Sequence, residues 1–417
     1  MQQNRLETSG DKASKGISRR DQWHAVTAGY LGWTLDAFDF FVLVFLVDVL
    51  AVQFGVPKSA IIWTLTATLA MRPVGAVIFG MLADRYGRRG PLMANVVFFS
   101  VIELLCGFAP NYSVFLILRM LYGIGMGGEW GVGASLAMES APKRLRGVLS
   151  GILQSGYSTG YLLAAVAARI VLPNLGWRAM FWVGGLPALL ALYIRFNVKE
   201  SEAWKQHRVP TMGALVKTAI SYWKIFIYLV LLMTLMVFLS HGTQDLYPDF
   251  LKSAHGVLPK TVSYLAIFYN IGAILGAIVF GHLSQSLGRR KGMIAALLLT
   301  ILAIPAWVFG GSLVILAVGA FFVQAGVQGA WGIIPAHINE LSPNTVRGLL
   351  PGFAYQLGIL FAAGTGTIEY ALSHHFGYAW ALAGFETANI LILATVVALG
   401  SERHGQDFGG YEANPTK

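Results

Sequence analysis

Long apolar stretches separated by short polar segments recur along the whole chain. A helix needs about 20 apolar residues to cross the hydrocarbon core of a bilayer, and most of these stretches reach that length. They predict an all-α polytopic membrane protein with twelve transmembrane helices. The approximate spans are residues 23–48, 59–83, 91–109, 112–137, 148–172, 179–195, 224–246, 262–285, 293–309, 313–336, 349–372 and 378–399.

The two halves of the chain repeat each other at an offset of 201 residues. The repeat covers three separate segments, which argues against coincidence, and it is typical of transporter folds built from two related halves. The matched positions are Gly80, Gly87, Arg88 and Arg89 with Gly281, Gly288, Arg289 and Arg290; Gly128, Trp130 and Gly131 with Gly329, Trp331 and Gly332; and Glu139, Pro142, Arg146 and Gly147 with Glu340, Pro343, Arg347 and Gly348.

The composition excludes an ordinary soluble protein. Of the 417 residues 56% are hydrophobic and 12% charged, whereas a soluble domain carries about 25% charged residues. The net charge of +10 is spread over short loops between the apolar stretches. It forms no single patch, so it indicates a membrane protein and not a nucleic-acid-binding one. Cys106 is the only cysteine, which excludes an intramolecular disulfide.

The distribution of Lys and Arg predicts the orientation, because cytoplasmic loops retain these residues. With the N-terminus inside, 23 of the 30 lie on the cytoplasmic side, two lie within spans (Arg72, Arg119) and five lie outside (Lys58, Arg169, Arg178, Lys252, Lys260). We therefore expect a cytoplasmic N-terminal tail (1–22), an N-terminal six-helix bundle (23–196), a cytoplasmic linker (197–222), a C-terminal six-helix bundle (223–400) and a cytoplasmic C-terminal tail (401–417).

Two motifs indicate a family. Residues 80–89, Gly-Met-Leu-Ala-Asp-Arg-Tyr-Gly-Arg-Arg, resemble the loop between helices 2 and 3 of the major facilitator superfamily, and residues 119–125 resemble its helix 4 motif. The resemblance implies two pseudo-symmetric six-helix bundles. In the second copy of the loop Gln285 and Ser286 replace the Asp and Arg. A charge-pair lock at the cytoplasmic gate is therefore expected mainly in the N-terminal half.

Three further segments narrow the resemblance to the sialate:proton symporter family, and most closely to its Jen-type lactate and pyruvate carriers. They are residues 35–41 on helix 1, 127–131 on helix 4, and Ser-His-Gly-Thr-Gln-Asp at 240–245 on helix 7. The Jen-type pattern has Asn and Thr where this chain has Val237 and Asp249. The resemblance implies proton-coupled symport of a small monocarboxylate.

Ionisable residues near the centres of spans mark functional positions, because each costs at least about 2.5 to 3.5 kcal/mol to insert. Asp36, Asp39, Arg72 and Glu129 are such residues. Their counterparts in the repeat are Val237, Ser240, Ala273 and Ala330, so the ionic groups are expected in the N-terminal half. The C-terminal half is expected to supply His241, Gln244, Asn270, Gln324, Gln328 and Gln356 instead.

The carboxyl groups in these spans are candidates for proton coupling. Asp36 and Asp39 are three residues apart, which places them on one face of a helix. Two nearby carboxylates in a low dielectric disfavour double ionisation, as proton coupling requires. The alternative is a structural role, such as pairing with Arg72. The proton-coupling candidates are Asp36, Asp39, Glu129 and Arg119. The alternative for Glu129 is hydrogen bonding between helices. The alternatives for Arg119 are a structural role and contact with the substrate.

Arg72 is the candidate for holding a substrate carboxylate, because guanidinium stays charged and binds a carboxylate through two parallel hydrogen bonds. The alternative is a permanent ion pair with Asp36, Asp39 or Glu129. His241 and Gln244, three residues apart, can donate hydrogen bonds from the other half. The full set of expected substrate-binding residues is Arg72, His241, Gln244, Asn270, Gln328 and Gln356.

Charged residues in the loop motifs are expected to form a cytoplasmic gate that pairs in the outward-open state and separates in the inward-open one. The alternative for the arginines is a role in membrane orientation alone. The gate residues are Asp84, Arg85, Arg88, Arg89, Glu139, Arg146, Glu340 and Arg347.

The chain has no phosphate-binding loop, metal-ligand cluster or activated nucleophile, so neither enzymatic activity nor a metal or other cofactor is expected. The expected partners are a small organic anion, a proton and the lipid bilayer, with no nucleic acid, and the protein is expected to act as a monomer in a bacterial inner membrane. Two alternatives remain for its function: a proton symporter for a sialic or aromatic acid, and a ligand sensor without net flux.

Overall fold

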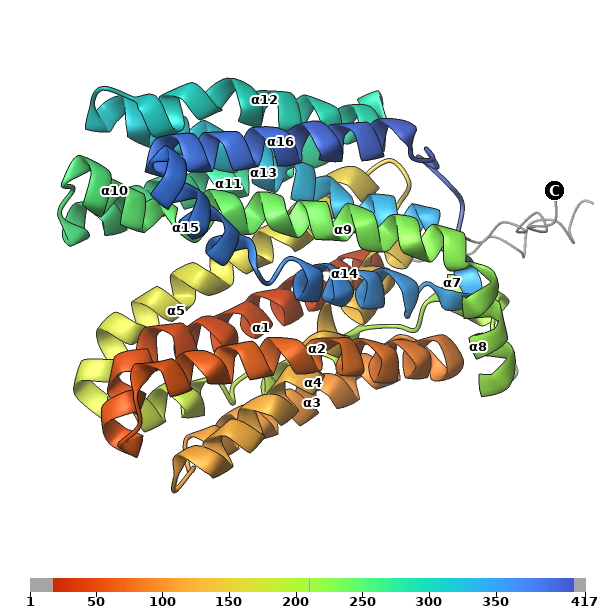
Figure 1. Ribbon diagram of the computed structural model, residues 1–417. Coiled ribbons are helices and arrows are strands. Elements are labelled where there is room, and N and C mark those ends of the chain that lie inside the picture. Colours follow the sequence, from red (N-terminus) through yellow and green to blue (C-terminus); the bar gives the residue numbers. More distant parts are fainter. Residues whose placement is uncertain (1–17, 210, 409–417) are drawn as a thin grey trace, which may run out of the picture.

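The computed structural model describes residues 18–209 and 211–408, which form helices joined by short turns, with no β-strand among them (Figure 1). The expected tail residues 1–17 and 409–417 lie outside the described residues. In chain order the helices are α1 Arg19–Phe54, α2 Lys58–Tyr86, α3 Arg89–Cys106, α4 Tyr112–Ser140, α5 Arg146–Val183, α6 Ala188–Asn197, α7 Glu202–Gln206, α8 Met212–Ser221, α9 Trp223–Gln244, α10 Tyr247–His255, α11 Pro259–Leu287, α12 Arg289–Phe309, α13 Leu313–Leu341, α14 Leu350–Phe361, α15 Thr365–Phe376 and α16 Tyr378–Leu399.

The internal repeat recurs in the helix boundaries. Both ends of α2 and α4 reappear 201 residues later as the ends of α11 and α13. The start of α4 is set by the Asn111 side chain, which accepts the Val114 backbone N–H at 3.0 Å. Ser312 performs the same capping for α13 through the Ile315 N–H at 3.3 Å. A capping residue at matched positions explains why the two helices begin in register.

The twelve predicted crossings correspond to these helices, and two of them are broken. Eight helices of the described part are long and apolar enough to cross a membrane by length and composition alone. The predicted first and fourth crossings fall on the long helices α1 and α4, which are not among these eight. The sixth crossing is split between the end of α5 and α6 by the turn at 184–187, and the eleventh between α14 and α15 by the turn at 362–364. Glycine and proline in these turns disfavour a continuous helix.

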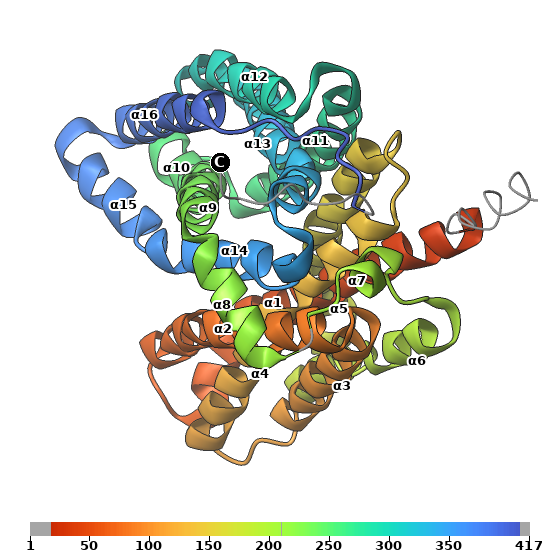
Figure 2. The ribbon, with the colours of Figure 1, turned by 90° about the vertical axis from the view of Figure 1, so that its right-hand side faces the viewer.

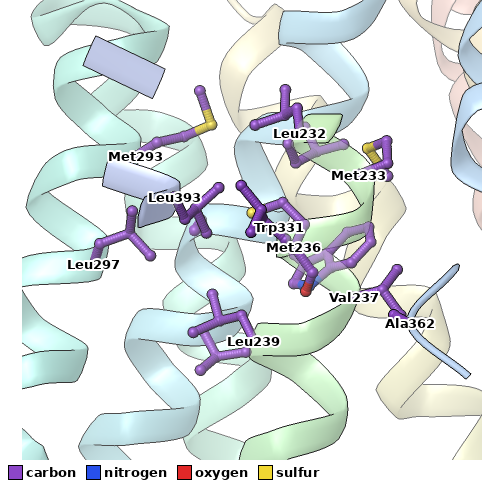
Figure 3. Close-up of a cluster of buried hydrophobic side chains, with 14 of the residues drawn as sticks. Leu232, Met233, Met236, Val237, Leu239, Met293, Leu297, Trp331, Ala362 and Leu393 are labelled. Atoms are coloured by element: carbon purple, nitrogen blue, oxygen red, sulfur yellow. The ribbon is translucent and has the colours of Figure 1, made fainter. Parts of the chain in front are cut away.

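The helices form two bundles, α1–α6 and α9–α16, which lie one above the other in the end-on view of Figure 2. In the C-terminal bundle the apolar side chains of α9 lie in one buried cluster with Met293 and Leu297 of α12, Trp331 of α13 and Leu393 of α16 (Figure 3). Large apolar side chains along the whole chain are also exposed on the outer faces, and Ile62 and Leu399 are two examples. Exposed apolar faces of this extent fit contact with lipid.

The linker between the bundles holds α7 and α8 at one end of the molecule, where residues 401–408 also lie (Figure 1). We call this the linker end. The opposite end, where α10 and the first residues of α2 and α11 lie, is the far end. Cys106, the last residue of α3, is fully buried among apolar side chains of the N-terminal bundle that include Phe115 and Trp177.

Candidate binding site between the two halves

Aromatic side chains from both bundles meet midway along the molecule. Trp33 of α1 stacks on Tyr157 of α5 with ring centroids 5.5 Å apart. Tyr355 of α14 lies 4.6 Å from Trp130 of α4 and 5.6 Å from Trp331 of α13. These five rings, which we call the aromatic site, come from five helices. Sequence reasoning matched Trp130 with Trp331 in the repeat but did not place these rings at the site, because no spacing along the chain links all five positions.

Arg72 lies at this aromatic site, with its guanidinium 5.8 Å from the Tyr355 ring centroid. Its side chain is 3% exposed, and Nε and one Nη have no hydrogen-bond partner among the described residues. No carboxylate of those residues lies within 4.0 Å of it. In this conformation Arg72 therefore forms no contact ion pair with Asp36, Asp39 or Glu129, although Asp36 and Glu129 lie close enough to act on it electrostatically. Its unpaired donors are of the kind that can hold an anion.

Close helix packing positions Arg72. A Cβ atom at Gly127 of α4 would lie 1.9 Å from the Arg72 carbonyl oxygen, so only glycine lets α4 approach α2 this closely. The Gln356 side chain of the opposite bundle donates to the Gly127 carbonyl at 3.3 Å. Arg72 and Gln356, both expected at the substrate site, are thus brought together. The indole N–H groups of Trp33 and Trp130 are also buried without partners in the described part of the chain.

The other expected substrate residues of the C-terminal bundle form a second group on α9 and α13. His241 lies 3.0 Å from Asp245, and these side chains are 41% and 46% exposed. Gln244 donates to Gln324 at 2.8 Å. Gln328 of α13 is buried. In contrast, Asn270 donates to the Ala266 carbonyl of its own helix at 2.8 Å, which leaves less of its amide available to a ligand.

The three expected proton-coupling carboxyls are fully buried, and none of their oxygens has a partner among the described residues. Asp36 and Asp39 share the buried side of α1. Glu129 packs against Gly32 of α1, one turn from Asp36. Asp39 lies against Gly184, which also contacts Glu103. The structure thus places no capping hydrogen bond or ion pair on either aspartate.

Glu103 of α3 was missed by the sequence analysis. It forms a buried ion pair of 2.6 Å with Arg119, whose guanidinium lies 4.1 Å from the Tyr122 ring centroid. Tyr122 in turn donates to the Asp36 carbonyl at 3.1 Å. Arg119 is therefore fixed by a carboxylate in this conformation. The position of Glu103 within an apolar stretch was the signal that could have revealed it.

The expectation that the ionic groups lie in the N-terminal half was wrong. The C-terminal bundle contains two fully buried carboxyls, Glu369 of α15 and Glu386 of α16. Neither has a counterpart of the same kind in the repeat, since the matched positions are Ala168 and Gly185. The comparison of the two halves started from the charged residues of the N-terminal half. It could therefore not find Glu369 and Glu386, which have an ionisable side chain in the C-terminal half alone.

Hydrogen bonds join the two bundles at the linker end in a symmetric pattern. Asp84 accepts the backbone N–H groups of Gly348 and Leu349 at 2.7 and 2.9 Å. Gln285, at the position matched to Asp84, accepts the N–H of Gly147 at 3.1 Å. Gly147 is itself the match of Gly348. A neutral amide can thus replace the carboxylate because both accept a backbone hydrogen bond.

Ion pairs reinforce this contact, and they occur in both halves. Arg88 pairs with Glu139 at 3.0 Å, and Arg289 pairs with Glu340 at 2.9 Å in the matched position. The expectation of a lock mainly in the N-terminal half is therefore corrected: Arg289, which was matched to Arg88 in the repeat but was not counted among the gate residues, completes an equivalent pair. Two ion pairs cross between the bundles, Glu139 with Arg347 at 3.4 Å and Arg146 with Glu340 at 3.1 Å.

The remaining gate candidates, Arg85 and Arg89, form no ion pair between the two bundles within the described part of the chain. Arg85 lies 5.2 Å from the Tyr86 ring, and Arg89 donates to the Ile194 and Arg195 carbonyls of its own bundle. In contrast, Phe408 is buried between the two bundles, with its ring 3.9 Å from the guanidinium groups of both Arg146 and Arg347. The linker end is closed, while Figure 1 shows the helices of the two bundles diverging toward the far end.

The closed linker end gives a prediction for Glu139→Gln. Glu139 joins Arg88 and Arg347, and removing one partner of a buried ion pair costs about 3 to 5 kcal/mol. We expect backbone hydrogen exchange at Gly348 and Leu349 to become roughly 100-fold faster, since opening exposes these amides. Hydrogen exchange followed by mass spectrometry measures this. The control is Glu202→Gln, which removes an exposed pair with Lys205; equal exchange in both variants would refute the gate role.

Comparisons with known proteins give a consistent result. Residues 18–215 and 216–400 each match the model of the family described as Sugar (and other) transporter. The chain is 33% identical over 391 residues to a probable 4-methylmuconolactone transporter of Cupriavidus pinatubonensis, with 90% of this chain and 88% of that protein covered. It is 31% identical over 381 residues to a carboxylic acid transporter protein homolog of Saccharomyces cerevisiae, with 85% of this chain covered but only 62% of the yeast protein's length.

Among solved structures, the proton:xylose symporter XylE superimposes with a TM-score of 0.75 at 18% identity. The superposition covers 93% of this chain and 98% of that one. At this identity the likeness shows the fold alone.

Proposed function

Because the chain belongs to the Sugar (and other) transporter family of the major facilitator superfamily, we propose that it carries a small organic acid anion together with a proton by alternating access. The observation that carries the proposal is Arg72, a buried guanidinium without a carboxylate partner, placed between the two bundles. Both bundles contribute to its surroundings, as a site that must open alternately to either side requires.

The surroundings of Arg72 favour one carboxylate attached to a small apolar or ring-shaped body. The guanidinium offers a planar pair of donors for the carboxylate, and the rings of Trp33, Trp130 and Tyr355 supply apolar walls. The unpaired indole N–H groups of the two tryptophans can donate to further oxygens. Lactate and pyruvate fit this chemistry as small monocarboxylates, in line with the Jen-type resemblance.

Ring-shaped carboxylates are the second candidate class. Five aromatic rings around one guanidinium also suit a flat ligand, because aromatic groups stack on one another. The similarity to a probable 4-methylmuconolactone transporter supports this class. A set of substrates that separates small acids from ring acids decides between them.

Proton coupling follows from charge balance. Moving one charge across a membrane is worth about 2.3 kcal/mol per 100 mV, so an inside-negative potential opposes the entry of a lone anion. One proton carried with the anion cancels that term. Asp36, Asp39 and Glu129 are the groups that we assign to the proton, because they are buried without ion-pair partners among the described residues. Asp36 and Glu129 also lie close enough to Arg72 to act on it electrostatically.

The orientation in the membrane determines to which side the binding site is open in this conformation. We place the linker end in the cytoplasm of a bacterial inner membrane, since the loops of that end hold most of the Lys and Arg residues. The closed linker end then corresponds to an outward-facing conformation, in which His241 and Asp245 are accessible from outside. Breaking the ion pairs of Glu139 and Glu340 leads to the inward-facing one.

Uptake into proteoliposomes tests the proposal. An inward proton gradient should drive accumulation of radiolabelled lactate, pyruvate or a ring acid such as benzoate, and a protonophore or an alkaline exterior should abolish it. A sialic acid serves as the test of the wider family, and substrate counterflow without any gradient separates transport from binding alone. Accumulation that follows sodium and ignores pH would contradict the coupling, and binding without counterflow would contradict transport.

A further inference from the structure

The two buried carboxyls of the C-terminal bundle converge on one point. A Cβ atom at Gly242 of α9 would lie 1.9 Å from Oε1 of Glu386 and 3.0 Å from Oε1 of Glu369. The two carboxyls thus occupy the space that any larger residue at 242 would fill. They come from different helices, α15 and α16, and both side chains are fully buried.

No positively charged group of the described residues compensates this carboxyl pair, although the Asn389 amide lies close enough to Glu386 to act on it. All four oxygens lack a hydrogen-bond partner in the described part of the chain, and no Lys, Arg or His nitrogen there lies within 4.0 Å of them. Two carboxylates so close together in a dry site repel each other, and burial alone already disfavours each charge. A proton shared between them removes one charge and supplies a hydrogen bond.

Some of the polar side chains next to Glu369 and Glu386 are themselves exposed to solvent. Asp245, the residue that follows α9, is close enough to act electrostatically on Glu369, and it bonds to His241. Both of these side chains are about half exposed. On α16, Asn389 donates to the Leu235 carbonyl, and the Tyr378 hydroxyl donates to Asp249 instead of to the pair. Asp245 and His241 are therefore partly exposed titratable groups that lie beside the pair at the end of α9.

We propose that Glu369 and Glu386 form a second proton-binding site, in the C-terminal bundle, which is loaded through Asp245 and His241. The inference rests on the proposed proton symport and deepens it. With one site in each bundle, the transporter moves two protons for each substrate carboxylate, one more than the charge of the anion alone requires. The pair touches α9, which also carries His241 and Gln244 at the interface between the bundles, so its protonation is coupled to the position of that helix.

The variants Glu369→Gln, Glu386→Gln and the double substitution test the site, because glutamine keeps the shape and hydrogen bonds of glutamate but does not release a proton. The control is Asp249→Asn, which alters an exposed carboxylate of α10 in the same bundle. The ratio of protons to substrate is obtained from the pH gradient that just balances a substrate gradient in proteoliposomes. We expect two protons in the wild type and control and one in the double variant.

Infrared difference spectra give a second measurement that does not depend on flux. We expect a protonated-carboxyl band that changes on a step in pH in the wild type and shifts in frequency in either single variant, because the remaining carboxyl loses its partner. The single variants also cover the case that the double variant does not fold. An unchanged proton ratio, or a band that never responds to pH, would overturn the second site. Absence of any proton-driven uptake by the wild type, with the infrared band still responding, would overturn the proposed symport and leave the proton site standing.

Discussion

Replacing Arg72 by lysine is expected to weaken substrate binding roughly 5- to 150-fold while leaving the melting temperature almost unchanged. Lysine keeps the positive charge but loses the planar pair of donors, which costs about 1 to 3 kcal/mol for a charge-assisted hydrogen bond. The folded protein loses little, because the Arg72 guanidinium contacts the Tyr355 ring and no carboxylate among the described residues.

Titration calorimetry with the preferred carboxylate, together with a thermal melt, measures both quantities on purified protein. Arg169→Lys, a change of the same kind at a position expected outside the membrane, is the matched control. Unchanged affinity combined with a lowered melting temperature would remove Arg72 from the binding site. It would make this arginine a structural residue of the aromatic site.

Neutralising the carboxyls of α1 is expected to abolish accumulation against a gradient. Asp36→Asn and Asp39→Asn each remove a group that can take up and release a proton, and both positions are buried without described partners. At least one variant should retain substrate counterflow, because exchange of substrate without a gradient requires no net proton movement. The two substitutions therefore separate coupling from binding.

The measurement compares proton-driven accumulation with counterflow in the same proteoliposomes. Asp48→Asn is the control on the same helix, where the carboxylate is exposed and pairs with Lys58 at 2.6 Å. Such an exposed pair contributes little. Normal accumulation by both Asp36→Asn and Asp39→Asn would exclude a coupling role for these residues.

The fold could be predicted from the sequence because the forces that set it are local or periodic. Apolar stretches of spanning length define the crossings, and matched residues such as Asn111 and Ser312 start matched helices. The breaks in the sixth and eleventh crossings were less visible, since the apolar pattern continues through the turns at 184–187 and 362–364.

The site could be predicted only in part, because its geometry depends on contacts between distant segments. Arg72 and Gln356 were expected together at the site and lie close to each other, joined through Gly127. The aromatic site escaped prediction because its rings come from five helices. Arg289 was overlooked because its loop lacks the usual Asp, whose place Gln285 takes by accepting the same kind of backbone hydrogen bond.

The burial of Cys106 has a practical consequence for measuring the motion between the bundles. Thiol reagents need an accessible thiolate, and the only cysteine of the chain is fully buried. The natural sequence is therefore a background for spin or fluorophore labels without prior removal of cysteines. Lys58 and Lys260 are exposed at the starts of α2 and α11, one in each bundle. A label pair at these two positions reports the width of the far end as substrate and protons bind.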